Sequence, residues 1–377
     1  MASFSAKWKW GIAAGLVLAV VVLWNPLRDL VLAARIACVL QRQAANSTGE
    51  GLAIKETKIR RPAKSGSYEA LIYRPAKLPA QRAIIIVAGL SEMGCYHPSL
   101  IAFSRMMADA GFLVITPDVE IFRKFQISAE PVEQFVFWYN QIGTLEESEK
   151  VRKTGLAGIS YSGTLAIIAA ARDEVRDKVA FAMGIGPYFN LTRCAREWFA
   201  SGPVTVSAGY YPTRFYAKWI VMLAALDLVR KGEDRQFLRS LLDALLLQKN
   251  VPPLPAGLTA EGLRWYRLAT MREDESDSEL ARQIEDYMVA RVFGALDPRD
   301  SLSKLRCPAF FLHGAYDDLI PPGESMELHR RAANSYLLVS PFLTHTHPSD
   351  KPLSFLQRAR AAVDAVRFCY QFSRAMR

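Results

Sequence analysis

Residues 153–173, KTGLAGISYSGTLAIIAAARD, have the pattern of a buried strand that turns abruptly into a helix. We expect the strand over 153–160 and the helix from 163 onward. The segment Gly158-Ile159-Ser160-Tyr161-Ser162 lies at the junction and matches G-x-S-x-G, except that serine replaces the last glycine. In this motif the central serine occupies a strained turn, and its small neighbours let strand and helix approach closely. The segment therefore contains a candidate nucleophile.

Two serines compete for that role. Ser160 stands at the turn itself, whereas Ser162 lies off the turn, on its helical side. A nucleophile needs a base beside it and donors for an oxyanion, and the turn supplies that access. We therefore favour Ser160 and interpret Ser162 as a small residue that keeps the close packing tolerable.

The surrounding sequence alternates between strands and helices. Two segments, 51–59 and 67–75, alternate apolar and polar residues as an edge hairpin does. Three solid apolar runs indicate strands buried on both faces, at 82–90, 112–118 and 178–187. Helical patterns separate these runs, so the sequence predicts an α/β fold with a doubly wound, mostly parallel sheet.

The alternation of predicted strands and helices stops at residue 188 and returns at residue 307. The intervening residues are rich in Trp, Tyr and Leu at helical spacing. The alternation then resumes with a strand at 307–314, a helix at 323–333, a strand at 336–342 and a final helix at 351–373. We expect one α/β domain over 52–377, with a helical cap insertion at about 188–300 above the carboxyl ends of the strands.

The N-terminal sequence predicts a membrane anchor. Residues 10–27 carry no charge, and Trp8, Trp10 and Trp24 lie near the ends of this run. An apolar helix of about 20 residues spans a bilayer, and tryptophan favours its interfaces. We therefore expect a single-pass transmembrane anchor at 8–27 and a juxtamembrane linker at 28–51. A cleaved signal peptide is the alternative, and the lysines and arginines on both sides leave the orientation open.

Charge and cysteine content exclude several classes of function. The chain has 377 residues and a net charge of +10, but its basic residues are scattered, without an Arg-rich helix or an RNA-binding motif. We predict no nucleic-acid partner. The five cysteines are dispersed and form no CxxC pair. The sequence therefore suggests neither a disulfide framework nor a metal site, and no cofactor is implied.

The residues that would complete a catalytic triad follow Ser160 in the required order of acid and then histidine. Asp317 and Asp318 lie in a loop after the strand at 307–314. His345 and His347 lie in the loop before the last helix. In such a triad the histidine removes the serine proton, and the acid orients and stabilises the imidazole.

With these motifs the chain resembles the α/β-hydrolase family over about residues 52–377. HGAYDDLIP (313–321) matches the family's HGxxDxxIP segment, which implies that Asp317 is the triad acid. The family's histidine follows the last strand, which favours His345 over His347. AGLSEMG (88–94) resembles the oxyanion loop, so the backbone N–H groups of Leu90 and Tyr161 would hold the oxyanion.

The resemblance implies a membrane-anchored serine hydrolase of the esterase or lipase type. It would cleave a carboxylic ester or a related acyl substrate through an acyl-enzyme, and the apolar cap hints at a hydrophobic acyl group. The large insertion and anchored layout also resemble poorly characterised bacterial membrane-bound hydrolases. An acyltransferase or peptidase on the same triad remains an alternative, as does a non-catalytic binding protein of the same shape. Ser162 in place of glycine and Ala88 in place of the family's usual histidine favour the last of these.

Overall fold

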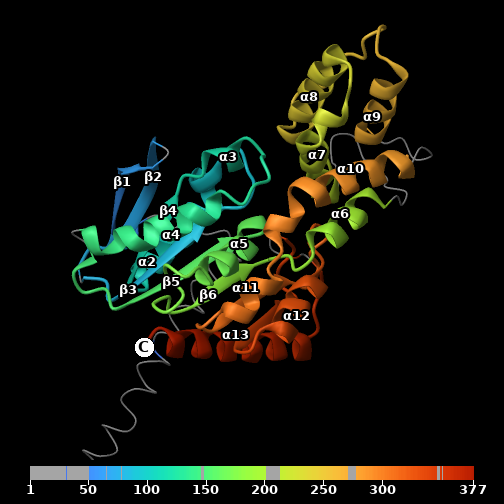
Figure 1. The fold of residues 1–377 in the computed structure, drawn as a ribbon. Helices are drawn as coiled ribbons and strands as arrows, with labels where there is room; N and C mark the ends of the chain where they lie inside the picture. The colour runs from blue at the N-terminus through green and yellow to red at the C-terminus, as the bar shows by residue number, and fades with distance from the viewer. Residues whose placement is uncertain are drawn as a thin grey trace, which may run out of the picture.

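A mixed sheet forms the centre of the molecule (Figure 1). The computed structural model describes residues 31, 51–64, 66–77, 79–145, 148–200, 213–270, 277–345, 349 and 351–377. The described residues form an eight-stranded sheet in the order β1-β2-β4-β3-β5-β6-β7-β8. Its strands are β1 Ile54–Ala63, β2 Gly66–Pro75, β3 Arg82–Val87, β4 Phe112–Pro117, β5 Lys153–Ile159, β6 Ala182–Ile185, β7 Ala309–Gly314 and β8 Ser335–Ser340. Strand β2 pairs antiparallel with β1 and β4, and the other pairs are parallel. The predicted mostly parallel α/β sheet with an edge hairpin is confirmed.

Helices cover both faces of this sheet and extend beyond one end of it (Figure 1). The α-helices are α2 Pro98–Asp109, α3 Glu120–Arg123, α4 Pro131–Gln141, α5 Tyr161–Ala170, α6 Leu191–Phe199, α7 Thr213–Ala224, α8 Gly232–Leu246, α9 Ala260–Thr270, α10 Ser278–Arg291, α11 Arg299–Lys304, α12 Pro322–Arg331 and α13 Phe355–Ala375. Short 3-10 turns are η1 Gly94–Tyr96, η2 Ile142–Thr144, η4 Leu226–Leu228 and η5 Phe293–Leu296.

Strand β3 shows how the sequence divides the core into two layers. Ile84 and Ile86 belong to the apolar cluster that contains the buried residues of α2 and α13. Ile85 and Val87 belong to the second cluster, together with α4, α5 and the cap helices. All four side chains are buried, and each such burial contributes about 1.5–3 kcal/mol. The solid apolar run therefore marks a strand covered on both faces, as expected.

The cap helices α6 to α10 lie between β6 and β7 in the sequence and extend from one end of the sheet (Figure 1). Glu324 of α12 binds the start of this insertion. Its side chain is only 2% exposed, and its hydrogen-bond donors come from the residues that lead into the cap and from α6. Its carboxylate accepts hydrogen bonds from the backbone N–H of Phe189 at 2.8 Å and of Asn190 at 2.7 Å. The Arg193 guanidinium donates a third bond at 2.6 Å.

Several predicted boundaries were wrong: β3 ends at Val87 rather than at residue 90, and α5 begins at Tyr161 rather than at residue 163. Two others have local reasons. The last helix begins at Phe355 rather than at residue 351, because Ser354 and Gln357 form a reciprocal capping box there. Strand β6 covers only Ala182–Ile185, four residues of the expected 178–187. It ends there because Gly186 adopts a φ of +63°, which is incompatible with an extended strand.

The expected anchor at 8–27 and almost all of the expected linker at 28–51 lie outside the described residues. In the part of the chain that the structure describes, no helix combines the length and apolar character needed to cross a bilayer.

Gly158 tests the close approach of β5 and α5. A Cβ atom there would lie 2.0 Å from the backbone oxygen of Ser162, so Gly158→Ala must push the helix away from the strand. We expect it to lower the free energy of unfolding by about 1–3 kcal/mol, the usual range for overpacking, as measured by urea denaturation. Gly143→Ala is the matched control, because a Cβ atom at Gly143 meets nothing within 4 Å. Equal stability of the two variants would contradict this packing.

Candidate active site

Ser160 lies at the turn between β5 and α5 in a conformation that L-residues rarely adopt. Its backbone has φ 58° and ψ −126°, and such positions cost about 1–3 kcal/mol unless the surroundings hold them. Its N–H donates to the Ile185 carbonyl at 2.6 Å, which ties the turn to the end of β6. The sharp turn lifts the Ser160 side chain out of the regular strand, as the sequence predicts for the nucleophile position.

Ser162 supports the same turn from within the core. It is fully buried, and its hydroxyl accepts from the Ile159 N–H at 2.8 Å. The single proton of the same hydroxyl faces two acceptors, the Val87 carbonyl at 2.8 Å and the Ile159 carbonyl at 2.9 Å. Ser162 thus joins β3 to the turn, a bond that glycine at this position could not make. Its burial among these partners excludes it as an accessible nucleophile in this conformation.

The structure brings Ser160, Asp317 and His345 into one hydrogen-bonded chain. The Ser160 Oγ lies 2.8 Å from Nε2 of His345, and Nδ1 of the same ring lies 2.7 Å from Oδ2 of Asp317. The carboxylate holds the proton on Nδ1, so Nε2 is free to accept the proton of the Ser160 hydroxyl. Ser160 follows β5, Asp317 follows β7 and His345 follows β8. His347, the alternative histidine, lies outside the described residues.

Asp317 is held by donors on both of its oxygens. Oδ1 accepts from the backbone N–H groups of Leu319 and Ile320, each at 2.9 Å. Oδ2 faces His345 and also His313, whose Nε2 lies 3.1 Å away. Burial alone would raise the pKa of Asp317, but the hydrogen bonds from His313 and His345 outweigh it and hold the pKa well below its usual value. Asp317 therefore stays ionised and fixed in orientation.

Gly314, the last residue of β7, lets the histidine loop approach. A Cβ atom there would lie 2.1 Å from the Thr344 carbonyl oxygen. A Cβ atom at Gly186 would lie 3.5 Å from Cε1 of His345, which is an ordinary van der Waals contact. The Gly314 of the HG pair is therefore needed for the loop that carries His345 to pack against the end of β7.

The loop after β3 passes close to Ser160. A Cβ atom on Gly89 would lie 3.2 Å from the Ser160 Cβ, so glycine permits this approach. Tyr161 is the first residue of α5, where backbone N–H groups lack intrahelical acceptors. Leu90 and Tyr161 thus flank the predicted nucleophile from two sides. Their role as oxyanion donors remains a prediction.

Strand order and side-chain placement together define the architecture. A sheet in which β2 alone runs antiparallel, with Ser, Asp and His after β5, β7 and β8, has the arrangement described for enzymes with a serine elbow. The chain has the α/β-hydrolase fold.

Of the comparisons with known proteins, only the one with solved structures found similar chains. No protein-family model and no curated protein matches the chain. Among solved structures, it is similar to a 2,6-dihydroxy-pseudo-oxynicotine hydrolase, with 15% identity, a TM-score of 0.48, and coverage of 84% of this chain and 67% of the other. It is also similar to Est1E from Butyrivibrio proteoclasticus, with 15% identity, a TM-score of 0.45, and coverage of 84% and 98%. A third is a Pyrococcus furiosus esterase, with 12% identity, a TM-score of 0.46, and coverage of 85% and 94%.

His313 of β7 is buried, and both of its ring nitrogens lie within hydrogen-bond distance of neighbouring polar atoms. Its Nε2 lies 2.8 Å from the Ile320 carbonyl as well as near Asp317, and its Nδ1 lies 2.6 Å from the Ser325 hydroxyl. Since both neighbours of Nε2 are acceptors, Nε2 carries the proton and Ser325 donates to Nδ1. His313 therefore acts as a positioning residue for Asp317.

Tyr216 of cap helix α7 is a site residue that sequence reasoning missed. Its hydroxyl donates to the Leu90 carbonyl oxygen at 3.0 Å, across a separation of 126 residues. Its ring packs edge-on against Phe125 with centroids 5.7 Å apart. The bond holds the Leu90–Ser91 peptide, which adjoins the Leu90 N–H predicted to donate to the oxyanion, so the position of the cap influences that geometry. No motif in the sequence links these two segments.

Other candidate groups have structural roles. Burial raises the pKa of the Cys95 thiol to about 12, so this residue, just after the predicted oxyanion loop, is not an activated thiolate. The His97 side chain accepts from the Ser99 N–H and caps α2. Within the described residues, no group of three or more His, Cys, Asp or Glu side chains is arranged to hold a metal ion.

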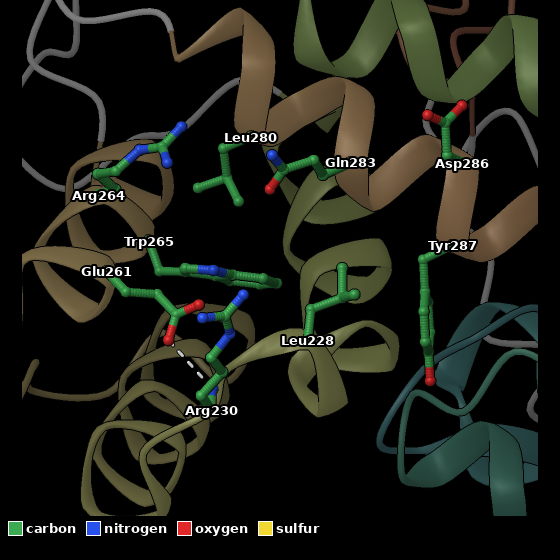
Figure 2. A pocket seen from close by; sticks show the side chains of 9 residues that line it. All are labelled: Leu228, Arg230, Glu261, Arg264, Trp265, Leu280, Gln283, Asp286 and Tyr287. Carbon is green, nitrogen blue, oxygen red and sulfur yellow. Dashed lines mark hydrogen bonds between the residues drawn. The ribbon is translucent and has the colours of Figure 1, made fainter.

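A cavity of about 430 Å³ lies inside the cap, between η4, α9 and α10 (Figure 2). None of the predicted site residues lines it. Trp265 forms part of its wall, and the remainder consists of two arginines, two carboxylates, two leucines, Gln283 and Tyr287. Trp198 and Trp219 of the cap donate from their indole nitrogens to the backbone carbonyls of Leu319 and Ala269. Both indoles are buried in the core.

Tyr216→Phe tests the link between cap and oxyanion loop. The change removes only the hydroxyl, so the Leu90 carbonyl loses one hydrogen bond and the loop gains freedom. We expect kcat on an ester substrate to fall about 2- to 10-fold, the size of one net hydrogen bond, with KM nearly unchanged. Tyr287→Phe, a cap tyrosine on α10 away from the loop, should retain wild-type kinetics. Equal rates for both variants would contradict a positioning role for Tyr216.

Asp317→Asn tests the electrostatics of the acid. A carboxyl whose pKa is lower in the folded state stabilises the protein above its unfolded pKa of about 4, and this stabilisation is lost as pH falls toward the folded value. We expect the unfolding free energy of the wild type to exceed that of Asp317→Asn at neutral pH. This difference in unfolding free energy should narrow below about pH 4. Urea denaturation at a series of pH values measures the difference. Asp318→Asn, at an exposed neighbour, is the control. A difference that widens in acid would contradict the account.

Proposed function

We propose that this chain is a serine hydrolase that cleaves a carboxylic ester or a related acyl substrate through a covalent acyl-enzyme. The observation that carries the proposal is the continuous set of hydrogen bonds from Ser160 through His345 to Asp317. A protein that only binds ligands has no need of this arrangement, and Asp317 is further fixed by two backbone donors. The strained turn at Ser160 also supports an active role, because such strain gathers at functional sites.

The proposed reaction begins with proton transfer from Ser160 Oγ to Nε2 of His345 as Oγ attacks the carbonyl carbon. Asp317 stabilises the imidazolium that forms. The N–H groups of Leu90 and Tyr161 would stabilise the oxyanion of the tetrahedral intermediate. His345 then gives the proton to the departing alcohol, which leaves an acyl group on Ser160. Water attacks this ester in a second round of the same proton transfers and releases the acid.

The site would be held at a membrane by the segment at 8–27. This part of the proposal rests on the length and apolar character of that segment and on the tryptophans at its ends. A tethered domain would act on substrates in or near the bilayer. A panel of esters with increasing acyl length would test whether the substrate is hydrophobic.

A fluorophosphonate probe tests the nucleophile. Such probes react with serines that an adjacent base activates, so the wild-type protein should become covalently labelled. Ser160→Ala should lose the label entirely. Ser162→Ala, which removes the hydrogen bonds of this hydroxyl to Val87 and Ile159 but not the nucleophile, should retain the label at a reduced rate. His345→Ala should also prevent labelling.

Folding of each variant is checked by circular dichroism and by its urea midpoint. A folded wild-type protein that takes no label would overturn the hydrolase proposal and favour the binding protein. Labelling that survives in Ser160→Ala but is lost in Ser162→Ala would show that the wrong serine was chosen. Labelling with acyl transfer to an added alcohol, in preference to water, would favour the acyltransferase.

A further inference from the structure

The N-terminal half of the last helix, α13, leaves a row of apolar side chains uncovered. Phe355 is 83% exposed, Leu356 78%, Val363 49% and Val366 48%. The buried residues of α13 (Ala361, Phe368, Cys369, Phe372 and Ser373) occupy the other side of the helix. Scattered exposed apolar residues are normal on protein surfaces, but a contiguous row on one helix face marks an interaction surface.

Arginines run beside this row. Leu356 and Val363 are seven residues apart, so they share a face, and Arg360 and Arg367 follow each of them by four positions. Arg374 continues the arginine row at the same spacing, and all three arginines are exposed. Asp364 is the one acidic residue in the sequence of α13, and it lies 3.9 Å from Arg367. An apolar row flanked by arginines is typical of helices that lie in a membrane interface.

The positive charge of this surface indicates which partner can bind it. A second copy of the chain would set the same arginines against each other. Residues 28–51 carry three arginines against one aspartate and one glutamate, so they do not complement the surface either. Anionic headgroups do complement it, and arginine can extend its guanidinium to the headgroup level while Phe355 and Leu356 enter the acyl boundary.

The course of the chain is consistent with a bilayer at this face. Leu52 and Ile54, where the described domain begins, pack against the apolar cluster that contains Phe368 and Phe372 of α13. The linker of residues 28–51 can extend to about 80 Å, so an anchor at 8–27 leaves α13 free to reach the membrane. The first turn of α13 also lies at the end of the sheet from which the cap rises (Figure 1). Docking would therefore bring this end of the molecule near the lipid.

We propose that the exposed face of α13, formed by Phe355, Leu356, Val363 and Val366 with Arg360, Arg367 and Arg374, docks on the surface of an anionic lipid bilayer. This docking orients the domain and does not depend on catalysis. Since it combines apolar insertion with charge attraction, it weakens when anionic lipid is removed or when ionic strength is raised.

An environment-sensitive fluorophore tests this contact directly. Leu356→Cys and Val363→Cys are made in full-length protein carrying Cys38→Ser, because the four cysteines of the described chain are buried. Each variant is labelled with a nitrobenzoxadiazole dye and reconstituted into vesicles of phosphatidylcholine with or without phosphatidylglycerol. Val289→Cys is the matched control, because Val289 is a valine of cap helix α10 that is 44% exposed.

The proposal predicts a blue shift of dye emission and quenching by brominated lipid at 356 and 363 in anionic vesicles, with neither effect at 289. Replacing the three arginines by glutamate should abolish the quenching while the circular dichroism spectrum is retained. Emission at 356 and 363 that matches 289 would overturn the proposal. A blue shift without quenching by bromolipid would also overturn it, since protein and not lipid would then cover the helix.

Discussion

The backbone of Ser160 is the constraint on which the rest of the site depends. A φ of 58° is costly for a residue with a side chain, so surrounding bonds must hold it. The Ile185 carbonyl accepts from the Ser160 N–H. The Ser162 hydroxyl accepts from the Ile159 N–H and lies within hydrogen-bond distance of the Val87 carbonyl of β3. Gly158 then allows the strand and helix that flank the turn to touch. With the turn held, Ser160 Oγ meets His345 without further movement.

The Asp317 carboxylate is likewise held by several hydrogen bonds at once. Asp317 is surrounded by four donors, two from the backbone of its own loop and two from histidines. His313 belongs to β7 and His345 to the loop after β8. The carboxylate therefore joins two neighbouring strand ends, and its ionisation and orientation depend on both.

The sequence predicted the parts of the molecule that depend on local pattern. The apolar run of β3, the G-x-S-x-S turn and the order of Ser160, Asp317 and His345 each carry a signal within a few residues or in chain order. Long-range contacts have no such signal. The bond from Tyr216 to Leu90 joins the cap to a loop 126 residues away, and the donor from His313 to Asp317 depends on side-chain direction. The capping box at Ser354 was readable in the sequence, and the predicted start of the last helix at 351 overlooked it.

Mass spectrometry of the trapped intermediate tests the central claim most directly. The protein is mixed with p-nitrophenyl acetate, quenched in acid within the first turnover and digested with trypsin, which releases residues 154–172 as one peptide. Fragmentation of that peptide separates Ser160 from Ser162. The account predicts an acetyl group on Ser160 that appears with the initial burst of nitrophenol and is absent from His345→Ala. An acetyl group on Ser162, or turnover with no acylated peptide, would contradict it.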